Sequence, residues 1–208
     1  MNDLQKVIDP ADVAGHKNRY INVLQHIALK DAIGNTTSKL TLDVGCGIQR
    51  FKDLFLQPLG IPQTYVGLDS DPQMNPHRVA DCNDIPFARD TFSIVLSVWM
   101  LQYQDDLQEC VDEIKRVLVP GGTLVMIEQI SNGYDEVLPR TPFGYSLAFG
   151  KEPERCVPIL NEGDLLVGVI RRGLVPERLF PVLARLHLML IKYTPKGVYT
   201  DYLMVFRK

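Results

Sequence analysis

The sequence predicts an α/β fold in which helices cover a mostly parallel sheet. Short apolar segments of strand length recur along the chain, and segments with helical periodicity lie between them, which is the alternation that parallel sheets require. The chain has 208 residues, within the usual size of one domain. We therefore expect residues 1–208 to form a single domain.

The elements of the first 130 residues are expected in a definite order. Residues 20–33 place apolar side chains at helical spacing, with Asn22, Gln25 and Lys30 on the other side, and lead into Gly34. The clearest helix spans residues 107–118, where Leu107, Ile114 and the apolar residues between them share one face. Strands are expected at 40–44, 64–68, 92–98 and 123–129, and 120–122 should form the turn before the last of these.

The periodic pattern loosens after residue 130. Residues 131–163 contain four prolines, four glycines and few periodic runs, which is typical of a functional loop. We interpret this segment as a substrate-facing insertion. Residues 165–172 then predict a helix that ends at Gly173, and residues 175–193 and 199–206 are expected as closing strands.

Composition restricts the partners and the compartment. A net charge of −3 gives no global attraction for phosphate backbones or anionic lipid, so nucleic acid is not expected, although a local basic patch such as Arg171–Arg172 remains possible. No stretch approaches about 18 uninterrupted apolar residues, and the first residues lack a basic region followed by an apolar run. We expect a cytoplasmic protein with no membrane insertion.

The four cysteines are widely separated and form no Cys-x-x-Cys pair. No histidine cluster of the kind that a zinc site needs accompanies Cys46, Cys82, Cys110 or Cys156. We therefore expect reduced thiols and no metal site.

Residues 42–47 are the most informative segment of the chain. An apolar strand containing Asp43 runs directly into a turn with Gly45, Cys46 and Gly47. Glycines at this place let a bound ligand approach the backbone closely, as in nucleotide-type cofactor sites. Three further signals follow in order along the chain: a strand that ends in Asp69, the segment 80–87, and the segment 117–124.

This ordered set of motifs resembles the class I S-adenosylmethionine (SAM) dependent methyltransferases of the Methyltransferase type 11-like family. The resemblance covers roughly residues 40–130. It implies a Rossmann-like three-layer sandwich with a mostly parallel seven-stranded sheet and an antiparallel last strand. It also implies four parts: an N-terminal helical segment (1–38), a cofactor-binding core (39–130), the insertion (131–163), and a closing helix and strands (164–208).

The resemblance implies that SAM is the cofactor and suggests where it binds. The loop from Asp43 to Gly47 would wrap its amino-acid end, and Asp69 could accept both ribose hydroxyls. Ser70 would lie beside the adenine, Asp81 would take the adenine amino group, and the end of the fourth strand, including Ser97, would line the methyl-transfer site. The full set of expected cofactor residues is Asp43, Gly45, Cys46, Gly47, Asp69, Ser70, Asp81, Cys82, Asn83 and Ser97.

One position departs from the family pattern. Gln49 stands where many relatives have a third glycine, and Arg50 holds the position of the last glycine of a dinucleotide fingerprint. NAD and FAD are therefore disfavoured, while SAM, which has no phosphates to cradle, is preferred.

The acceptor is predicted less specifically than the cofactor. We expect a small-molecule or sugar-containing acceptor, methylated on oxygen rather than on carbon or nitrogen. Its candidate contacts are Trp99, Glu128, Tyr134, Arg140 and Tyr145. No catalytic base is evident, and none is required unless the acceptor must lose a proton.

Two other functions remain open from the sequence. A non-catalytic binding or regulatory protein with the same fold is one, and a protein or RNA methyltransferase is the other. The oligomeric state is not predicted.

Overall fold

The computed structural model describes residues 13–33, 40–52, 65–130, 139–161, 165–191 and 199–208. Tyr134, one of the candidate acceptor contacts, lies outside these ranges. The helices are α2 (Val13–Ile33), α4 (Leu107–Val117), α5 (Pro142–Phe149), α6 (Leu165–Arg171) and α7 (Phe180–Leu190), with short 3₁₀ turns η2 (Pro72–Met74), η3 (Leu101–Tyr103) and η4 (Glu177–Leu179). The strands are β1 (Thr41–Val44), β2 (Tyr65–Asp69), β3 (Arg78–Val79), β4 (Phe92–Val98), β5 (Leu118–Gln129), β6 (Arg155–Asn161) and β7 (Tyr199–Arg207).

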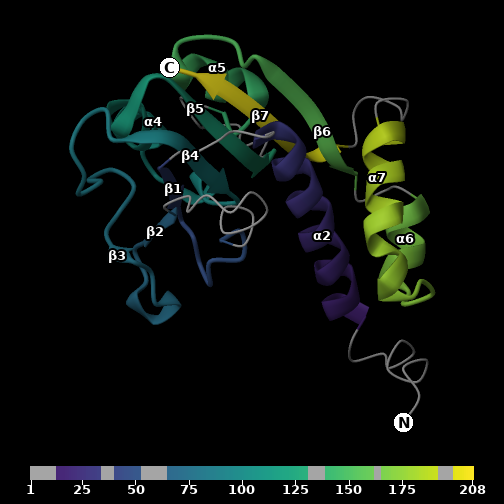
Figure 1. Ribbon diagram of the computed structural model, residues 1–208. Coiled ribbons are helices and arrows are strands. Elements are labelled where there is room, and N and C mark those ends of the chain that lie inside the picture. The colour runs from purple at the N-terminus through teal and green to yellow at the C-terminus, as the bar shows by residue number, and fades with distance from the viewer. Residues whose placement is uncertain (1–12, 34–39, 53–64, 131–138, 162–164, 192–198) are drawn as a thin grey trace. The chain divides into compact units, whose positions relative to one another are not determined.

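Seven strands form one mixed sheet in the order β3-β2-β1-β4-β5-β7-β6 (Figure 1). The pairs β3–β2, β2–β1, β1–β4 and β4–β5 are all parallel. Strand β7 runs antiparallel to β5, because the Gly121 and Lys208 amides donate hydrogen bonds to the Lys208 and Gly122 carbonyls at 3.2 and 2.8 Å. The predicted Rossmann-like, mostly parallel seven-stranded sheet is confirmed.

The chain divides into two compact units. Residues 32–156 and 202–208 form the unit that contains β1 to β5, α4 and α5, and residues 1–31 and 157–201 form the unit that contains most of α2 together with α6 and α7. Both β6 and β7 contribute residues to each unit. That the whole chain acts as one domain stays a prediction.

Helix α4 shows why the larger unit folds as it does. Its apolar positions recur every three or four residues, so Leu107, Val111 and Ile114 are all buried on one face. The Asp106 carboxylate caps the helix by accepting the Glu109 amide at 2.9 Å, and Lys115 and Arg116 occupy its last turn, where a cation is favoured by the helix dipole.

Arg116 also binds α4 to the loop that follows β3. Its guanidinium donates to the Phe87 and Ile85 carbonyls at 2.7 and 2.8 Å and pairs with Glu113. The Glu113 carboxylate in turn accepts the Ile85 amide at 2.9 Å. These bonds hold segment 81–87 against α4.

The structure corrects the expected closing strands. Residues 175–193 were expected as a strand, but residues 180–190 form helix α7. Large apolar residues lie on two faces of the segment, and its few charged residues do not form the broad polar face that distinguishes a surface helix from a buried strand. Strand β6 instead comes from residues 155–161 of the predicted insertion, which also contains α5.

Residues 120–122 were expected as a turn before the fifth strand, but they lie within β5. The pairing of β4 with β5 shifts register there, since Phe92 is opposite Leu118 while Ile94 is opposite Thr123. Gly121, at φ 73°, supplies the left-handed residue that such a bulge uses. Within the described residues, no helix has the length and hydropathy needed to cross a bilayer.

Candidate functional site

The predicted cofactor residues, apart from Ser97 in β4, lie at or just after the carboxyl ends of β1, β2 and β3. Strand order reverses between β1 and β4, because β2 and β3 lie on one side of β1 while β4 and β5 lie on the other. Open parallel sheets bind ligands at such a switch point, in the crevice outside the strand ends. The topology alone therefore places a ligand site after β1 and β4.

The loop after β1 is shaped by two left-handed glycines. Gly45 and Gly47 have φ angles of 70° and 49°. The Gly45 and Cys46 amides both donate to the Leu68 carbonyl, at 2.8 and 3.0 Å, so these amides already have acceptors in β2. A Cβ at Gly45 would lie only 2.3 Å from Met100 Cγ. Because Gly45 has no side chain, the β1 loop can approach the chain that follows β4 closely.

Gln49 explains how the loop forms without a third glycine. Its φ angle is 57°, in the left-handed region that glycine occupies most easily. The side-chain amide donates to the Asn75 carbonyl at 2.9 Å, and this bond helps to hold the residue in that conformation. Gln49 thus adopts the left-handed backbone conformation that a glycine would adopt at this position.

Asp69 lies at the end of β2 and links the two neighbouring loops. One carboxylate oxygen accepts the Gly47 amide at 2.8 Å, and the other accepts the Asp71 amide at 3.0 Å. Each carboxylate oxygen can accept more than one hydrogen bond, so both retain capacity for a ligand hydroxyl. The side chain also lines the cavity described below.

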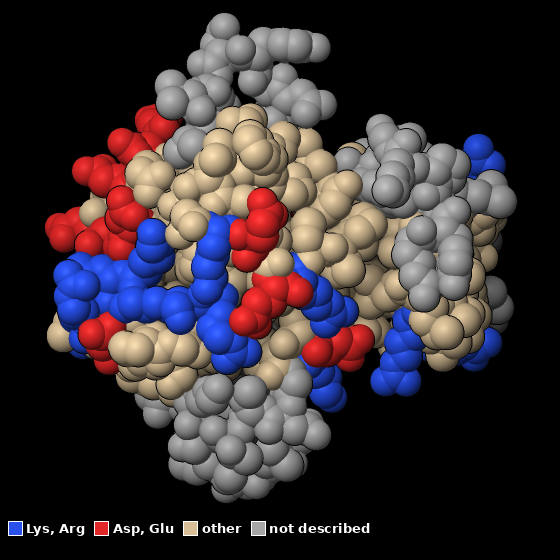
Figure 2. All heavy atoms as spheres, turned by 90° about the horizontal axis from the view of Figure 1, so that it is seen from above, with Lys and Arg blue, Asp and Glu red and all other residues tan. Residues whose placement is uncertain are grey.

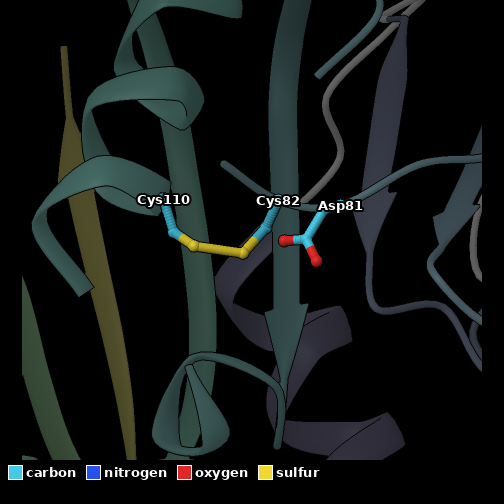
Figure 3. A group of neighbouring side chains, drawn as sticks. All are labelled: Asp81, Cys82 and Cys110. Atoms are coloured by element: carbon cyan, nitrogen blue, oxygen red, sulfur yellow. A yellow bond between two sulfur atoms is a disulfide. The ribbon is translucent and has the colours of Figure 1, made fainter. Parts of the chain in front are cut away.

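Asp81 and Cys82 follow β3 directly. Cys82 is bonded to Cys110 of α4 with the Cα atoms 5.0 Å apart, and Figure 3 shows Asp81 beside this bridge. The expectation of four reduced thiols is therefore wrong for this pair, because the fold brings together cysteines 28 residues apart. A carboxylate oxygen of Asp81 and both sulfur atoms lie within 4.8 Å of one another, but the sulfurs bond to each other rather than standing free as thiolate ligands. Asn83 is exposed, and its amide donates to Asp81 at 3.4 Å.

A cavity of about 180 Å³ lies at these strand ends. Its lining comprises Val44, Gly45, Leu68, Asp69, Ser70, Ala80, Asp81, Cys82, Trp99, Met100, Tyr103 and Gln104. Five of the ten predicted cofactor residues are among them. Whole-ligand pockets usually measure roughly 300–1,000 Å³, so a cofactor of that size would extend beyond this cavity.

Six lining residues lie outside the predicted set, and three of them, Met100, Tyr103 and Gln104, follow β4. These three lie on the far side of the switch point from Asp69. Their sequence carries no distinctive motif, but their place directly after a central parallel strand is a signal that topology reasoning could have used.

Glu128 is buried and binds the chain after β4 rather than opening onto the cavity. One oxygen accepts the Ser97 hydroxyl at 2.6 Å and the Leu101 amide at 3.3 Å, and the other accepts the Gln102 amide at 3.3 Å. Burial raises the pKa of Glu128 to about 7, although these hydrogen bonds lower it. Glu128 and Ser97, predicted to contact acceptor and cofactor, thus contact each other in the interior.

Asp43 is likewise buried, beneath the β1 loop. The Tyr65 hydroxyl donates to its carboxylate at 2.5 Å, which joins the neighbouring strands β1 and β2. Burial raises the pKa of Asp43 to about 7, and the Tyr65 hydrogen bond and the charge of Arg50 oppose that rise.

The other candidate acceptor contacts occupy different environments. Trp99 lines the cavity at φ 55°, a left-handed conformation that is costly for a bulky residue. Arg140 and Tyr145 are buried, at 5% and 2% exposed, and the Arg140 guanidinium donates to the carbonyl of the cavity residue Gln104. Their predicted contact with an acceptor stays a prediction.

The face drawn in Figure 2 carries charges of both signs next to one another. Pairs of this kind in the larger unit include Lys208 with Asp90 at 2.6 Å and Arg207 with Glu154 at 2.9 Å. This arrangement fits the low net charge of the chain.

Comparison with known proteins identifies the core. Residues 42–126 match the model of the family described as "Methyltransferase domain", and this range runs from β1 into β5. The match covers about two fifths of the chain and agrees with the predicted resemblance to class I methyltransferases. SAM is the cofactor of this class, in agreement with the prediction.

The methyltransferase domain is also similar to individual proteins. A sterol 4-C-methyltransferase of Caenorhabditis elegans is 38% identical over 58 residues, which cover 27% of this chain and 17% of that protein. A ubiquinone/menaquinone biosynthesis C-methyltransferase of Desulfotalea psychrophila is 33% identical over 66 residues, which cover 32% of this chain and 27% of that protein. The matches thus span about a quarter or less of these curated relatives.

Among solved structures, the geranyl diphosphate C-methyltransferase of Streptomyces coelicolor superposes with a TM-score of 0.61. The match covers 88% of this chain and 74% of that one at 18% sequence identity. That structure was determined with S-adenosyl-L-homocysteine bound. At this level of identity the likeness concerns the fold.

Proposed function

We propose that this protein transfers the methyl group of SAM to a small organic acceptor. The observation that carries the proposal is the composition of one cavity. Carboxylates suited to the cofactor, Asp69 and Asp81, line it from β2 and β3, while Trp99 and Tyr103 line it from the chain after β4. Cofactor and acceptor groups would therefore meet at the switch point of the sheet.

The chain's own residues would act mainly by binding and orienting. Asp69 would accept the ribose hydroxyls while its bonds to Gly47 and Asp71 keep it in place. Asp81 lies in the loop after β3, which Cys110 and Arg116 hold against α4. From there its carboxylate would accept a hydrogen bond from the adenine amino group. The absent side chain of Gly45 would leave room for Met100 beside the cofactor.

Methyl transfer itself is an in-line displacement. Bound SAM would supply a methyl group carried by a positively charged sulfur. An electron pair of the acceptor would form the new bond to the methyl carbon, the sulfur would keep the electron pair of the broken bond, and any proton on the acceptor atom would pass to solvent. Holding the two atoms at near-attack distance can supply much of the rate. Trp99, Met100 and Tyr103 are placed to shape that contact.

Oxygen on a small-molecule or sugar-containing acceptor is the target that the sequence predicts. Carbon is the second candidate, and a specific observation favours it: both curated relatives and the superposed structure are C-methyltransferases. Aromatic residues on the acceptor side suit an apolar, unsaturated substrate as well as a phenol.

Transfer of a ¹³C-labelled methyl group would test the proposal. The protein is incubated with labelled SAM and sets of phenols, sugars and isoprenoid quinols, and mass spectrometry detects methylated products. The chemical shift of the label separates methoxy from C-methyl products. Turnover abolished in Asp69→Ala but kept in Asp112→Ala, an exposed carboxylate on α4, would support an enzyme.

Two results would redirect the proposal. SAM binding without turnover on any acceptor class would favour the non-catalytic binding protein. Label found only in added protein or RNA, with a rate that falls steeply as salt is raised, would favour a macromolecular methyltransferase.

A further inference from the structure

Helix α7 has apolar side chains on two faces, and one of these faces packs against described residues of its unit. Phe180, Ala184 and His187 are buried, and the Phe180 ring meets Tyr20 of α2 edge-on with centroids 5.4 Å apart. The Tyr20 hydroxyl also lies 3.2 Å from His187 Nδ1. This face anchors the helix.

The second face is apolar and open to solvent. Leu179, Val182, Leu186, Met189 and Leu190 follow one another at intervals of three or four residues and then one, so they form a single stripe along the helix. Their exposed fractions run from 44% for Leu179 to 65% for Met189. Leu174, just before the helix, is 68% exposed. A row of large exposed aliphatic side chains marks an interaction surface.

The positive charge of the surrounding segment indicates which kind of partner this surface binds. Residues 165–191 contain four arginines and one glutamate, a net charge of +3 in a chain whose total is −3. Arg172, Arg178 and Arg185 are exposed. Arg185 lies within α7, three residues after Val182 and four before Met189, and therefore beside the stripe, while Arg178 lies in the turn η4 directly before the helix.

We propose that the segment 165–191 docks on an anionic lipid surface, with the α7 stripe in the headgroup boundary and the arginines on lipid phosphates. Interfacial helices combine these two features: aliphatic side chains enter the boundary while flanking cations attract acidic lipid. Pairing of this face with a second copy would bring two segments of charge +3 together, which is unfavourable. A nucleic acid would neutralise the arginines but leave the stripe exposed.

Such docking differs from insertion across a bilayer. At 11 residues α7 is about 16 Å long, well short of the length that spans the hydrocarbon core. The helix would lie along the surface, and the rest of the chain, being acidic, would be repelled from it. This inference does not depend on the proposed methyl transfer.

Vesicle sedimentation tests the proposal. The protein is spun with large vesicles of phosphatidylcholine alone or of phosphatidylcholine mixed with phosphatidylglycerol. We expect binding to the mixed vesicles only, weakened by added salt. Both Arg178→Glu/Arg185→Glu and Leu186→Asn/Met189→Gln should reduce the partition coefficient by about tenfold or more.

Matched controls lie on the larger unit. Leu147→Asn replaces a leucine that is 52% exposed on α5, and Arg89→Glu replaces an exposed arginine outside the segment, so neither should change vesicle binding. Circular dichroism and SAM titration of every variant check folding independently of lipid. Failure to bind mixed vesicles would overturn the proposal, as would equal binding by the stripe variants, or a concentration-dependent dimer in sedimentation velocity that Leu186→Asn abolishes.

Discussion

Gly45 is the residue at which the cofactor site is most sensitive to a single methyl group. A Cβ there would collide with Met100 Cγ and Cβ, at 2.3 and 2.7 Å, and these atoms are close to the backbone of the cavity wall and cannot swing away freely. Replacement by any other residue would also force a left-handed conformation on it.

We predict that Gly45→Ala lowers the affinity for SAM by at least about tenfold. Gly150→Ala is the matched control, because Gly150 also has a positive φ, 83°, but a Cβ there would meet nothing within 4 Å. Both variants carry the strain of an alanine at positive φ, and only the first fills space beside the cavity. Equal SAM affinities in calorimetric titration would contradict the role given to Gly45.

At the same scale, the structure places the predicted site residues in different environments. Gly45, Asp69 and Asp81 line the cavity as their motifs indicated, because a strand end fixes where the next side chains point. Ser97 and Glu128 were expected to contact ligands, yet they bond to each other at 2.6 Å inside the protein. A polar residue near the end of a strand can point toward a ligand or into the interior. In a strand buried on both faces, the sequence has no alternation of polar and apolar residues that would distinguish these two orientations.

Among the elements, β5 and the chain after β4 are joined by a buried carboxylate. The folded-state pKa of Glu128 is raised from 4.5 to about 7. Between these values the folded protein keeps a proton that the unfolded chain has released, so stability must fall as the pH rises through this window. The pKa of Asp43 is also raised to about 7, so this group likewise lowers the stability as the pH rises.

We predict that Glu128→Gln makes the free energy of unfolding less dependent on pH. The wild-type contribution from this group is on the order of 3 kcal/mol between pH 4.5 and 7, and the amide has no proton to lose there. Urea unfolding at pH 5 and pH 8 gives both values. A pH dependence identical in wild type and variant would show that Glu128 titrates normally. Glu109→Gln, an exposed position on α4, serves as the control.

The bridge between the β3 loop and α4 is a second link between elements. It closes a loop of 28 residues, which in the chain-entropy model stabilises a fold by about 3–4 kcal/mol. We predict that Cys110→Ser lowers the free energy of unfolding by roughly this amount, and that dithiothreitol lowers it for wild type but leaves the variant unchanged. Cys156→Ser, at an exposed free cysteine, should alter neither value. Equal stability of wild type with and without reductant would mean that the bridge contributes nothing.

Sequence periodicity predicted the elements of the core together with α2 and α6, and it failed at β6 and α7. Helix α4 and strands β1, β2 and β4 fall where expected, because polar and apolar residues alternate with a clear period or bound a short apolar run. Helix α7 was mistaken for a strand because its solvent face is apolar too. The feature that misled the prediction is the same stripe that suggests a lipid surface.

On the scale of the whole molecule, the chain has two surfaces with different chemistry. The larger unit contains the segment that matches the methyltransferase family model, with a cavity at the switch point of the sheet. The other unit presents a cationic, apolar helix.

The most direct test of the central claim is calorimetric titration of the protein with SAM and with S-adenosylhomocysteine, repeated on Asp69→Ala and Asp112→Ala. We predict micromolar binding of both ligands to wild type and to Asp112→Ala, and at least tenfold weaker binding to Asp69→Ala, since that change removes the acceptor for the ribose hydroxyls. Absence of heat with either ligand, or equal affinity in all three proteins, would contradict a cofactor site at the ends of β1, β2 and β3.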